Sequence, residues 1–230
     1  MFPDAESRRN RHARPIEIAR RHGSTPEQRW WDGCIGDAGD AAMDTSAVSE
    51  TVRSRALPVR IVGLGLYLPA SVETSSDLAD RVGRSADWIV SRVGVERRHI
   101  ADRPVEEIAA AAAREALSGG PPPDLIVNAS ATPRQAIPDT SVFVQRALGL
   151  GGIASYSIHA TCLSFVVALH VAATQVVSGG FRRVLVVSSE IGSVRRNMAQ
   201  PESAALFGDG AAAAVIEATP AGGRVRCCRG

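Results

Sequence analysis

The 230-residue chain is long enough to bury the core of one large domain or two small ones, and 45% of its residues are hydrophobic. Its formal net charge is +2 and its 26 basic residues are all arginine, which excludes a general argument for binding nucleic acid or a membrane. The four cysteines form no Cys-x-x-Cys pair, and no apolar run approaches twenty residues. A reduced, soluble, cytoplasmic protein without metal ligands is expected.

Residues 1–56 differ in composition and residue pattern from the remainder of the chain. Arginines crowd the start, little apolar periodicity follows, and Trp30 and Trp31 stand between polar and glycine-rich stretches. This composition is typical of a disordered extension. Met43 is a candidate for the true initiator, which would place most of the extension outside the native protein.

The first strand of the folded part is predicted from Val59 to Pro69, where it ends in a turn. Gly63 and Gly65 match half of a dinucleotide-binding fingerprint, but Leu68 occupies the third glycine position. Pro69 also prevents a helix from opening where that motif needs one. We interpret the two glycines as sites of close packing against a neighbouring strand.

Helices and strands alternate through the residues that follow. They comprise two short helices capped near Ser75 and Ser85, a helix opened by Pro104, a strand over Asp124 to Ala129, a helix over Ser141 to Leu148, a strand ending at Ile158, a long helix from Leu163, and strands over Arg183 to Ser188 and Ala211 to Glu217. This order predicts an α/β layered domain over residues 57–220, with strands covered on both faces. Residues 221–230 are expected to be a truncated tail.

Cys162 stands where a strand is predicted to pass into the N-terminus of the long helix. Free backbone N–H groups and the positive end of the helix dipole favour a thiolate at such a position. A thiolate there suits covalent catalysis. An inert, buried cysteine explains the same residue equally well, because free cysteines are among the most buried side chains.

Trp88 and Arg92 are four residues apart on a short predicted helix and therefore share a face. Such a pair is commonly a core tryptophan beside an arginine that extends to solvent. An indole and a guanidinium also suit the stacking and phosphate contacts of a nucleotide site. Both interpretations remain open at this point.

Four separated segments together resemble the β-ketoacyl-acyl carrier protein synthase III family of the thiolase superfamily. They are Gly63-x-Gly65-x-Tyr67-Leu68-Pro69, the Asp87-Trp88-Ile89 to Ile100 segment, the Ala160-Thr161-Cys162 elbow, and Phe207-Gly208-Asp209-Gly210-Ala211. The resemblance implies the N-terminal half of a thiolase-like layered fold, with a mixed sheet around a buried central helix. It also implies that half of such a fold leaves a broad apolar face uncovered.

The resemblance implies an acyltransferase of fatty-acid or related biosynthesis. Such an enzyme loads an acyl group from acyl-CoA onto Cys162 and joins it to malonyl-acyl carrier protein with loss of CO2. Trp88 and Arg92 match the family's adenine-stacking and phosphate-contacting residues, and Ile137 matches a residue that enters the partner's acyl pocket in the family homodimer. Acyl-CoA is a substrate here, and no cofactor is implied.

The family's catalytic His and Asn belong to a second half that this sequence does not include, so the chain is expected to be incompetent alone. We expect His159 to be a core or interface residue, His170 to be packed, His99 to be structural, and Asp209 to organise a turn. The competing interpretation is a non-catalytic half-domain, which would serve dimerisation or carrier-protein binding or be the product of an interrupted gene. A weaker third is an α/β hydrolase, whose elbow Leu163 and Ser164 fit poorly.

Overall fold

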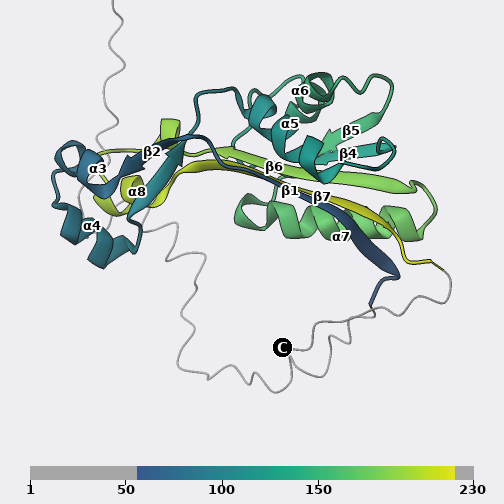
Figure 1. The fold of residues 1–230 in the computed structure, drawn as a ribbon, viewed down its shortest axis with the longest axis horizontal. Helices are drawn as coiled ribbons and strands as arrows, with labels where there is room; N and C mark the ends of the chain where they lie inside the picture. The colour runs from purple at the N-terminus through teal and green to yellow at the C-terminus, as the bar shows by residue number, and fades with distance from the viewer. Residues whose placement is uncertain (1–55, 221–230) are drawn as a thin grey trace, which may run out of the picture. The chain divides into compact units, whose positions relative to one another are not determined.

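A five-stranded mixed sheet in the order β1-β7-β6-β4-β5 forms the centre of the computed structural model, which describes residues 56–220 (Figure 1). Its strands are β1 (Val59–Tyr67), β4 (Leu125–Asn128), β5 (Ala154–Ser157), β6 (Arg183–Ile191) and β7 (Asp209–Ala218). β4 is parallel to both β5 and β6, whereas β7 is antiparallel to both β6 and β1. The expectations for the N-terminal extension, Met43 and the tail fall on residues outside the described range, apart from Ala56.

Helices cover both faces of this sheet, as the order of elements predicts (Figure 1). Helices α5 (Val105–Ala116) and α6 (Thr140–Leu148) lie on one face, and α7 (Ser164–Val177) lies on the other. Two separate clusters of buried aliphatic side chains fill the two interfaces. The layered α/β fold predicted from the sequence is confirmed.

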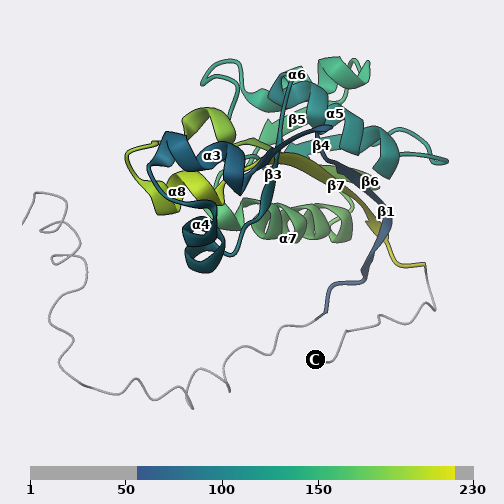
Figure 2. The same ribbon diagram turned by 60° about the vertical axis from the view of Figure 1, so that its left-hand side comes forward.

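A smaller group of elements gathers at one end of the sheet (Figure 2). It comprises a two-stranded sheet of β2 (Ser71–Thr74) and β3 (Arg97–Ile100), with helices α3 (Ser75–Val82), α4 (Ala86–Val93) and α8 (Pro201–Leu206). Buried Arg98 ties this group together, because its Nε donates to the carbonyl oxygen of Ala205 at 2.5 Å. Ser85 caps α4 as predicted, but Thr74 rather than Ser75 caps α3, through a capping box with Asp77.

Helix α7 packs on the sheet through one face and leaves its opposite face exposed. Val166 on that outer face is 62% exposed. Leu64 and Leu66 of β1 are also exposed, which extends the amount of uncovered apolar surface. The expected uncovered apolar face is therefore present, and within residues 56–220 the central helix is buried on one side only. Among residues 56–220, no helix is both long and apolar enough to cross a membrane.

Gly63 and Gly65 lie against helix α5, so the prediction that they pack against a neighbouring strand is wrong. A Cβ atom on Gly63 would stand 2.0 Å from the carbonyl oxygen of Ala116, and one on Gly65 would stand 2.0 Å from that of Ala112. Real Cβ atoms do not approach backbone so closely, so β1 and α5 can pack at this distance only with glycine. Small alanines on the helix complete the close fit.

We predict that Gly65→Ala lowers the free energy of unfolding by about 3 kcal/mol, at the upper end of the usual cost of overpacking. The new methyl group has to push α5 away from the sheet or distort β1. Urea denaturation followed by circular dichroism measures the change. Gly151→Ala is the matched control, because nothing lies within 4 Å of a Cβ atom at Gly151. Equal stability of the two variants would contradict the close-packing explanation.

Candidate active site

Cys162 lies in a one-turn 3-10 helix, η1 (Thr161–Leu163), between the end of β5 and the start of α7. The predicted junction of strand and helix is therefore confirmed. The cysteine is a free thiol and is exposed, which excludes the alternative of an inert, buried residue. An accessible sulfur beside a helix N-terminus has the placement that a nucleophilic cysteine needs.

The residue before the cysteine has an unusual backbone conformation. Thr161 has φ of +50°, which is strained for a β-branched residue and typically costs about 1–3 kcal/mol. Ser164 holds the turn from inside: its hydroxyl accepts from the Ala160 N–H at 2.9 Å and donates to the Thr161 carbonyl at 2.7 Å. Ser164 is only 2% exposed, so these two hydrogen bonds are shielded from water. Cys162 follows Thr161 in this strained turn, and its side chain is exposed.

Cys162 borders a pocket of about 560 Å³. The pocket lies beyond the ends of β4, β5 and β6, where these parallel strands finish and their loops begin. Ligands of open α/β sheets characteristically bind at this edge. Its lining residues include Ala129, Thr132, His159, Phe165, Glu190, Arg195 and Phe207.

Glu190 shapes the pocket by holding the loop that follows β4. One carboxylate oxygen accepts from the Ala131 N–H at 2.6 Å, and the other accepts from the N–H and hydroxyl of Thr132 at 2.9 and 2.8 Å. With both oxygens engaged by backbone and side-chain donors, the carboxylate serves as a clamp. Both oxygens of Glu190 are therefore engaged in hydrogen bonds, and neither is left free to act as a general base for Cys162.

A buried polar network supports the floor of the site. The Asn128 amide donates to Ser157 Oγ at 2.9 Å and accepts from Ser130 Oγ at 2.8 Å. Ser130 Oγ in turn accepts from the Ser189 N–H at 2.9 Å. These bonds join the ends of β4, β5 and β6 across the sheet, and satisfied buried networks of this kind make a local structure rigid.

Two of the histidine expectations are wrong in part. His159 is exposed and lines the Cys162 pocket, so it is not a core residue, and its Nδ1 accepts from the Thr161 N–H at 3.4 Å. His170 is exposed on the outer face of α7 rather than packed. His99 is structural as expected, because its ring nitrogen Nδ1 bonds the carbonyl of Pro69 at 2.6 Å.

Asp209 organises the chain beside the pocket, as expected. It is 6% exposed and accepts from the N–H and hydroxyl of Ser193 at 2.8 and 2.6 Å, and from the N–H of Ala101 at 2.7 Å. Ser193 begins η2 (Ser193–Arg195), a short 3-10 turn after β6. Just beyond this turn, Arg196 donates to Glu73 of β2. Asp209 and Glu73 therefore anchor opposite ends of one segment that borders the pocket.

The structure does not bring the other three predicted residues into the lining of this pocket. Trp88 is partly buried against the cluster formed by α3, α4 and α8, and Arg92 is exposed with its Nε 4.0 Å from Glu202 of α8. Ser203 of α8 lines the pocket, so α8 stands between the pocket and α4. Ile137 is 87% exposed on the loop after β4.

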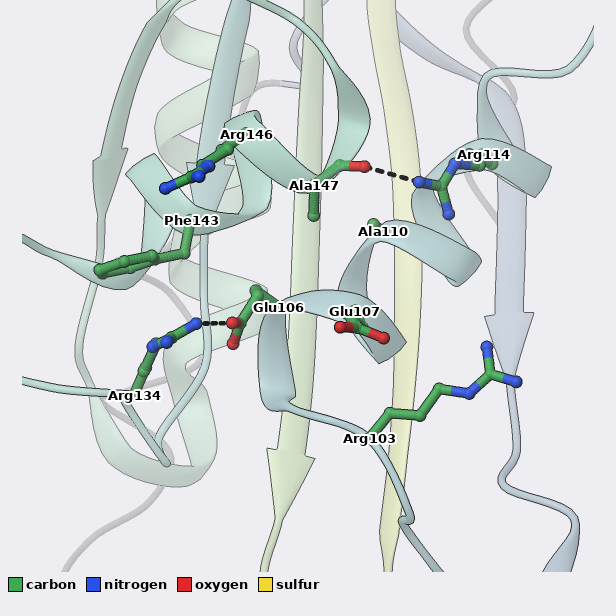
Figure 3. Close-up of a pocket in the computed structure, with 9 residues that line it drawn as sticks. All are labelled: Arg103, Glu106, Glu107, Ala110, Arg114, Arg134, Phe143, Arg146 and Ala147. Carbon is green, nitrogen blue, oxygen red and sulfur yellow. Dashed lines mark hydrogen bonds and ion pairs between the residues drawn. The ribbon is translucent and has the colours of Figure 1, made fainter.

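A second hollow of about 560 Å³ lies between α5 and α6 (Figure 3). Four arginines and two glutamates dominate its lining, and the guanidinium of Arg134 points to buried Glu106 while lying 4.5 Å from the centre of the Phe143 ring (Figure 3). Of the described residues, no Cys, Ser, Thr or His lines this hollow. Because it lacks a nucleophile, the chemistry of the side chains favours the Cys162 pocket as the active site.

Several residues that line or support the Cys162 pocket carry only faint signals in the sequence. Ser164 is of the residue type that satisfies free N–H groups at helix starts, although it is the first residue of α7 and not its cap. Glu190 is a charged residue near the end of an otherwise buried strand, which is a recognised position for site residues. Arg195 has no local signal, because nothing in its neighbourhood along the chain indicates a pocket.

Sequence and structure comparisons agree on the relatives of this chain. The sequence model of 3-oxoacyl-[acyl-carrier-protein] synthase III matches residues 156–227. A β-ketoacyl-[acyl-carrier-protein] synthase III of Methylococcus capsulatus is 40% identical over 164 residues, which are 69% of this chain and 51% of that protein. The chain is related to the 3-oxoacyl-[acyl-carrier-protein] synthase III family.

Solved structures of the family place the described fold within the thiolase-like class. The 3-oxoacyl-[acyl-carrier-protein] synthase III of Aquifex aeolicus superposes with a TM-score of 0.68 at 36% identity, covering 70% of this chain and 54% of that one. The priming β-ketosynthase of the R1128 polyketide pathway superposes with a TM-score of 0.66 at 34% identity, covering 70% and 50%. The chain spans about half the length of the curated relatives that it matches.

We predict that Ser164→Ala lowers the free energy of unfolding by about 1–3 kcal/mol, because the Ala160 N–H loses its buried acceptor. The rate of Cys162 alkylation by iodoacetamide should fall at the same time, since the sulfur is no longer held at the helix start. Denaturation curves and mass spectrometry measure the two effects. Ser178→Ala, at the exposed end of α7, is the control. Unchanged alkylation in Ser164→Ala would contradict this role of the hydroxyl.

We also predict a dependence of stability on pH that Glu73 controls. Burial acts to raise the pKa of Glu73, but the hydrogen bond and charge of Arg196, together with Arg81, outweigh it and hold the pKa below its usual 4.5. The unfolded chain therefore binds this proton more readily than the folded chain. The stability that ionised Glu73 contributes is fully present above about pH 4.5 and is lost as the pH falls towards the pKa of Glu73 in the folded protein.

The measurement is the urea midpoint between pH 7 and pH 3.5. Glu73→Gln should be less stable at pH 7 and should lose less of its remaining stability on acidification than the parent chain. The exposed residue Glu96 offers the control Glu96→Gln. Parallel acid profiles for the parent and Glu73→Gln would show that this carboxylate is not responsible.

Proposed function

We propose that Cys162 is the acylated nucleophile of a 3-oxoacyl-acyl carrier protein synthase III type reaction. The observation that carries this proposal is the exposed thiol at a strained turn before α7, opening on a pocket at the ends of parallel strands. Similarity to the 3-oxoacyl-[acyl-carrier-protein] synthase III family supplies the reaction class. The hydrolase alternative has no comparable support.

The nucleophile of the first half-reaction is a group that this chain contains. The thiolate of Cys162 attacks the carbonyl carbon of an acyl-CoA thioester, a new carbon–sulfur bond forms, and the bond to coenzyme A breaks. Coenzyme A leaves as a thiolate and takes a proton from solvent. The backbone N–H of Cys162 would be one half of an oxyanion hole for the negative charge that develops on the carbonyl oxygen.

The proposed coenzyme contacts come from α4. Trp88 would stack on the adenine ring and Arg92 would contact phosphate, since its guanidinium is exposed and its carboxylate neighbour is 4.0 Å away. Exposed Ile137 would meet a second copy of the protein, as the family homodimer suggests. Because neither Trp88 nor Arg92 lines the Cys162 pocket, their roles require the coenzyme to extend over α8.

The second half-reaction joins the acyl group to malonyl-acyl carrier protein with loss of CO2. The enolate formed by decarboxylation needs stabilising donors, which are commonly the largest single contribution to catalysis. We propose that these donors come from a second half of the fold, and that the 230-residue chain by itself stops at the acyl-thioester. The cytoplasm, where acyl-CoA is available, is the proposed location.

A second candidate function is a non-catalytic module that pairs with another protein surface. The exposed apolar side chains of α7 and β1, including Val166, Leu64 and Leu66, favour it. In this case Cys162 would be accessible without being acylated by a thioester. The two functions are therefore separated by one chemical measurement.

Incubation of the chain with butyryl-CoA should add one butyryl group, and Cys162→Ser should retain no thioester, as intact-protein mass spectrometry can measure. Trp88→Ala should slow loading at low coenzyme concentration by about tenfold or more, the loss of one base-stacking contact of about 1–3 kcal/mol. Val177→Ala, at the exposed end of α7, is the matched control. Absence of any adduct on the correctly folded chain would favour the pairing module.

A further inference from the structure

Arg195 is a charged residue of the Cys162 pocket to which no role has been assigned. It ends the η2 turn and borders both this pocket and a neighbouring hollow of about 390 Å³. Within residues 56–220, its guanidinium has no hydrogen bond and no ion pair. The other arginine in the linings of these two hollows, Arg134, pairs with Glu106, and the adjacent residue Arg196 pairs with Glu73.

The absence of a partner in the described range is not the result of a loose segment. Ser193, two residues earlier, is held by both carboxylate oxygens of buried Asp209. Arg196, the next residue, is held by Glu73 and also donates to the Ser193 carbonyl at 3.0 Å. The residues on both sides of Arg195 are therefore anchored, and Arg195 itself is exposed at the border of the pocket.

Glu190 is the acidic residue in the lining of this pocket, and within residues 56–220 no ion pair joins its carboxylate to Arg195. Its two oxygens accept instead from Ala131 and Thr132. The rest of the lining around Cys162 is largely apolar or small, with Ala129, Phe165 and Phe207 as examples. A guanidinium beside such a surface binds a carboxylate well, because it donates two parallel hydrogen bonds and is weakly hydrated.

We propose that Arg195 selects an acyl group that ends in a carboxylate, so that the pocket loads a dicarboxylic acyl thioester in preference to a neutral one. This inference rests on the proposed loading of Cys162 and names its substrate class. During loading the distal carboxylate stays ionised and takes no part in bond making. A carboxylate is favoured over a coenzyme phosphate because Arg195 borders the same pocket as the sulfur, whereas the pantetheine arm separates the phosphates from the thioester.

The first test needs no acyl transfer. Iodoacetate and iodoacetamide alkylate a thiol by the same displacement of iodide and are similar in size, but only iodoacetate carries a carboxylate. The ratio of their rates at Cys162 should be at least about tenfold higher in the parent chain than in Arg195→Met, the lower end expected for a charge-assisted hydrogen bond. Arg195→Lys should recover part of the difference.

The matched control for this test is Arg182→Met. Arg182 is 97% exposed, lies outside the pocket and should leave the ratio unchanged. Circular dichroism checks that each variant is folded. An equal iodoacetate preference in the parent chain and folded Arg195→Met overturns the inference, whatever the acyl-transfer result.

The second test compares glutaryl-CoA with pentanoyl-CoA, which have acyl chains of equal carbon number. Faster loading of glutaryl at Cys162, with the preference lost in Arg195→Met and kept in Arg182→Met, supports the inference. Equal loading of both, or a uniform loss of both in Arg195→Met, overturns it and leaves the proposed function standing. If neither acyl group loads, the proposed function fails, and the alkylation ratio alone decides whether Arg195 selects anions.

Discussion

The accessibility of Cys162 depends on a strained backbone conformation at Thr161 that the surrounding fold stabilises. A β-branched threonine with positive φ precedes the cysteine, and a strained backbone of this kind persists only where the surroundings determine it. The buried hydroxyl of Ser164 bonds the backbone on both sides of Thr161. Helix α7 then holds Ser164 against the sheet, so the packing of the helix is transmitted directly to the position of the sulfur.

Three acidic residues hold the segments around the pocket in place, through backbone N–H groups or through arginine side chains. Glu190 fixes the loop after β4, Asp209 fixes the start of η2, and Glu73 fixes the residue beyond it. Each carboxylate is used by several donors at once, which is how buried or half-buried charges are normally stabilised in proteins. Against this background, Arg195 is distinctive because its neighbours are anchored and its own charge is not engaged within the described residues.

Local patterns predicted much of the arrangement, because their causes are local. The period of apolar residues, the capping residues and the terminal glycines indicated most helices, and unbroken aliphatic runs indicated the inner strands. Contacts between segments that are distant in the sequence were harder to predict. Gly63 and Gly65 indicated that another backbone segment packs closely against this strand, but only the tertiary structure identifies that segment as α5.

The same distinction applies to the site. The order of strand, cysteine and helix can be derived from residues 155–178 alone, because the end of a strand and the start of a helix are both indicated by residues close together in the sequence. Whether the thiol is exposed, which histidines are packed, and which charges share its pocket follow from how β4, β5, β6 and α8 meet. Residues such as Glu190 and Arg195 lie about thirty positions from Cys162 along the chain, so their proximity comes from strand pairing, which no short pattern contains.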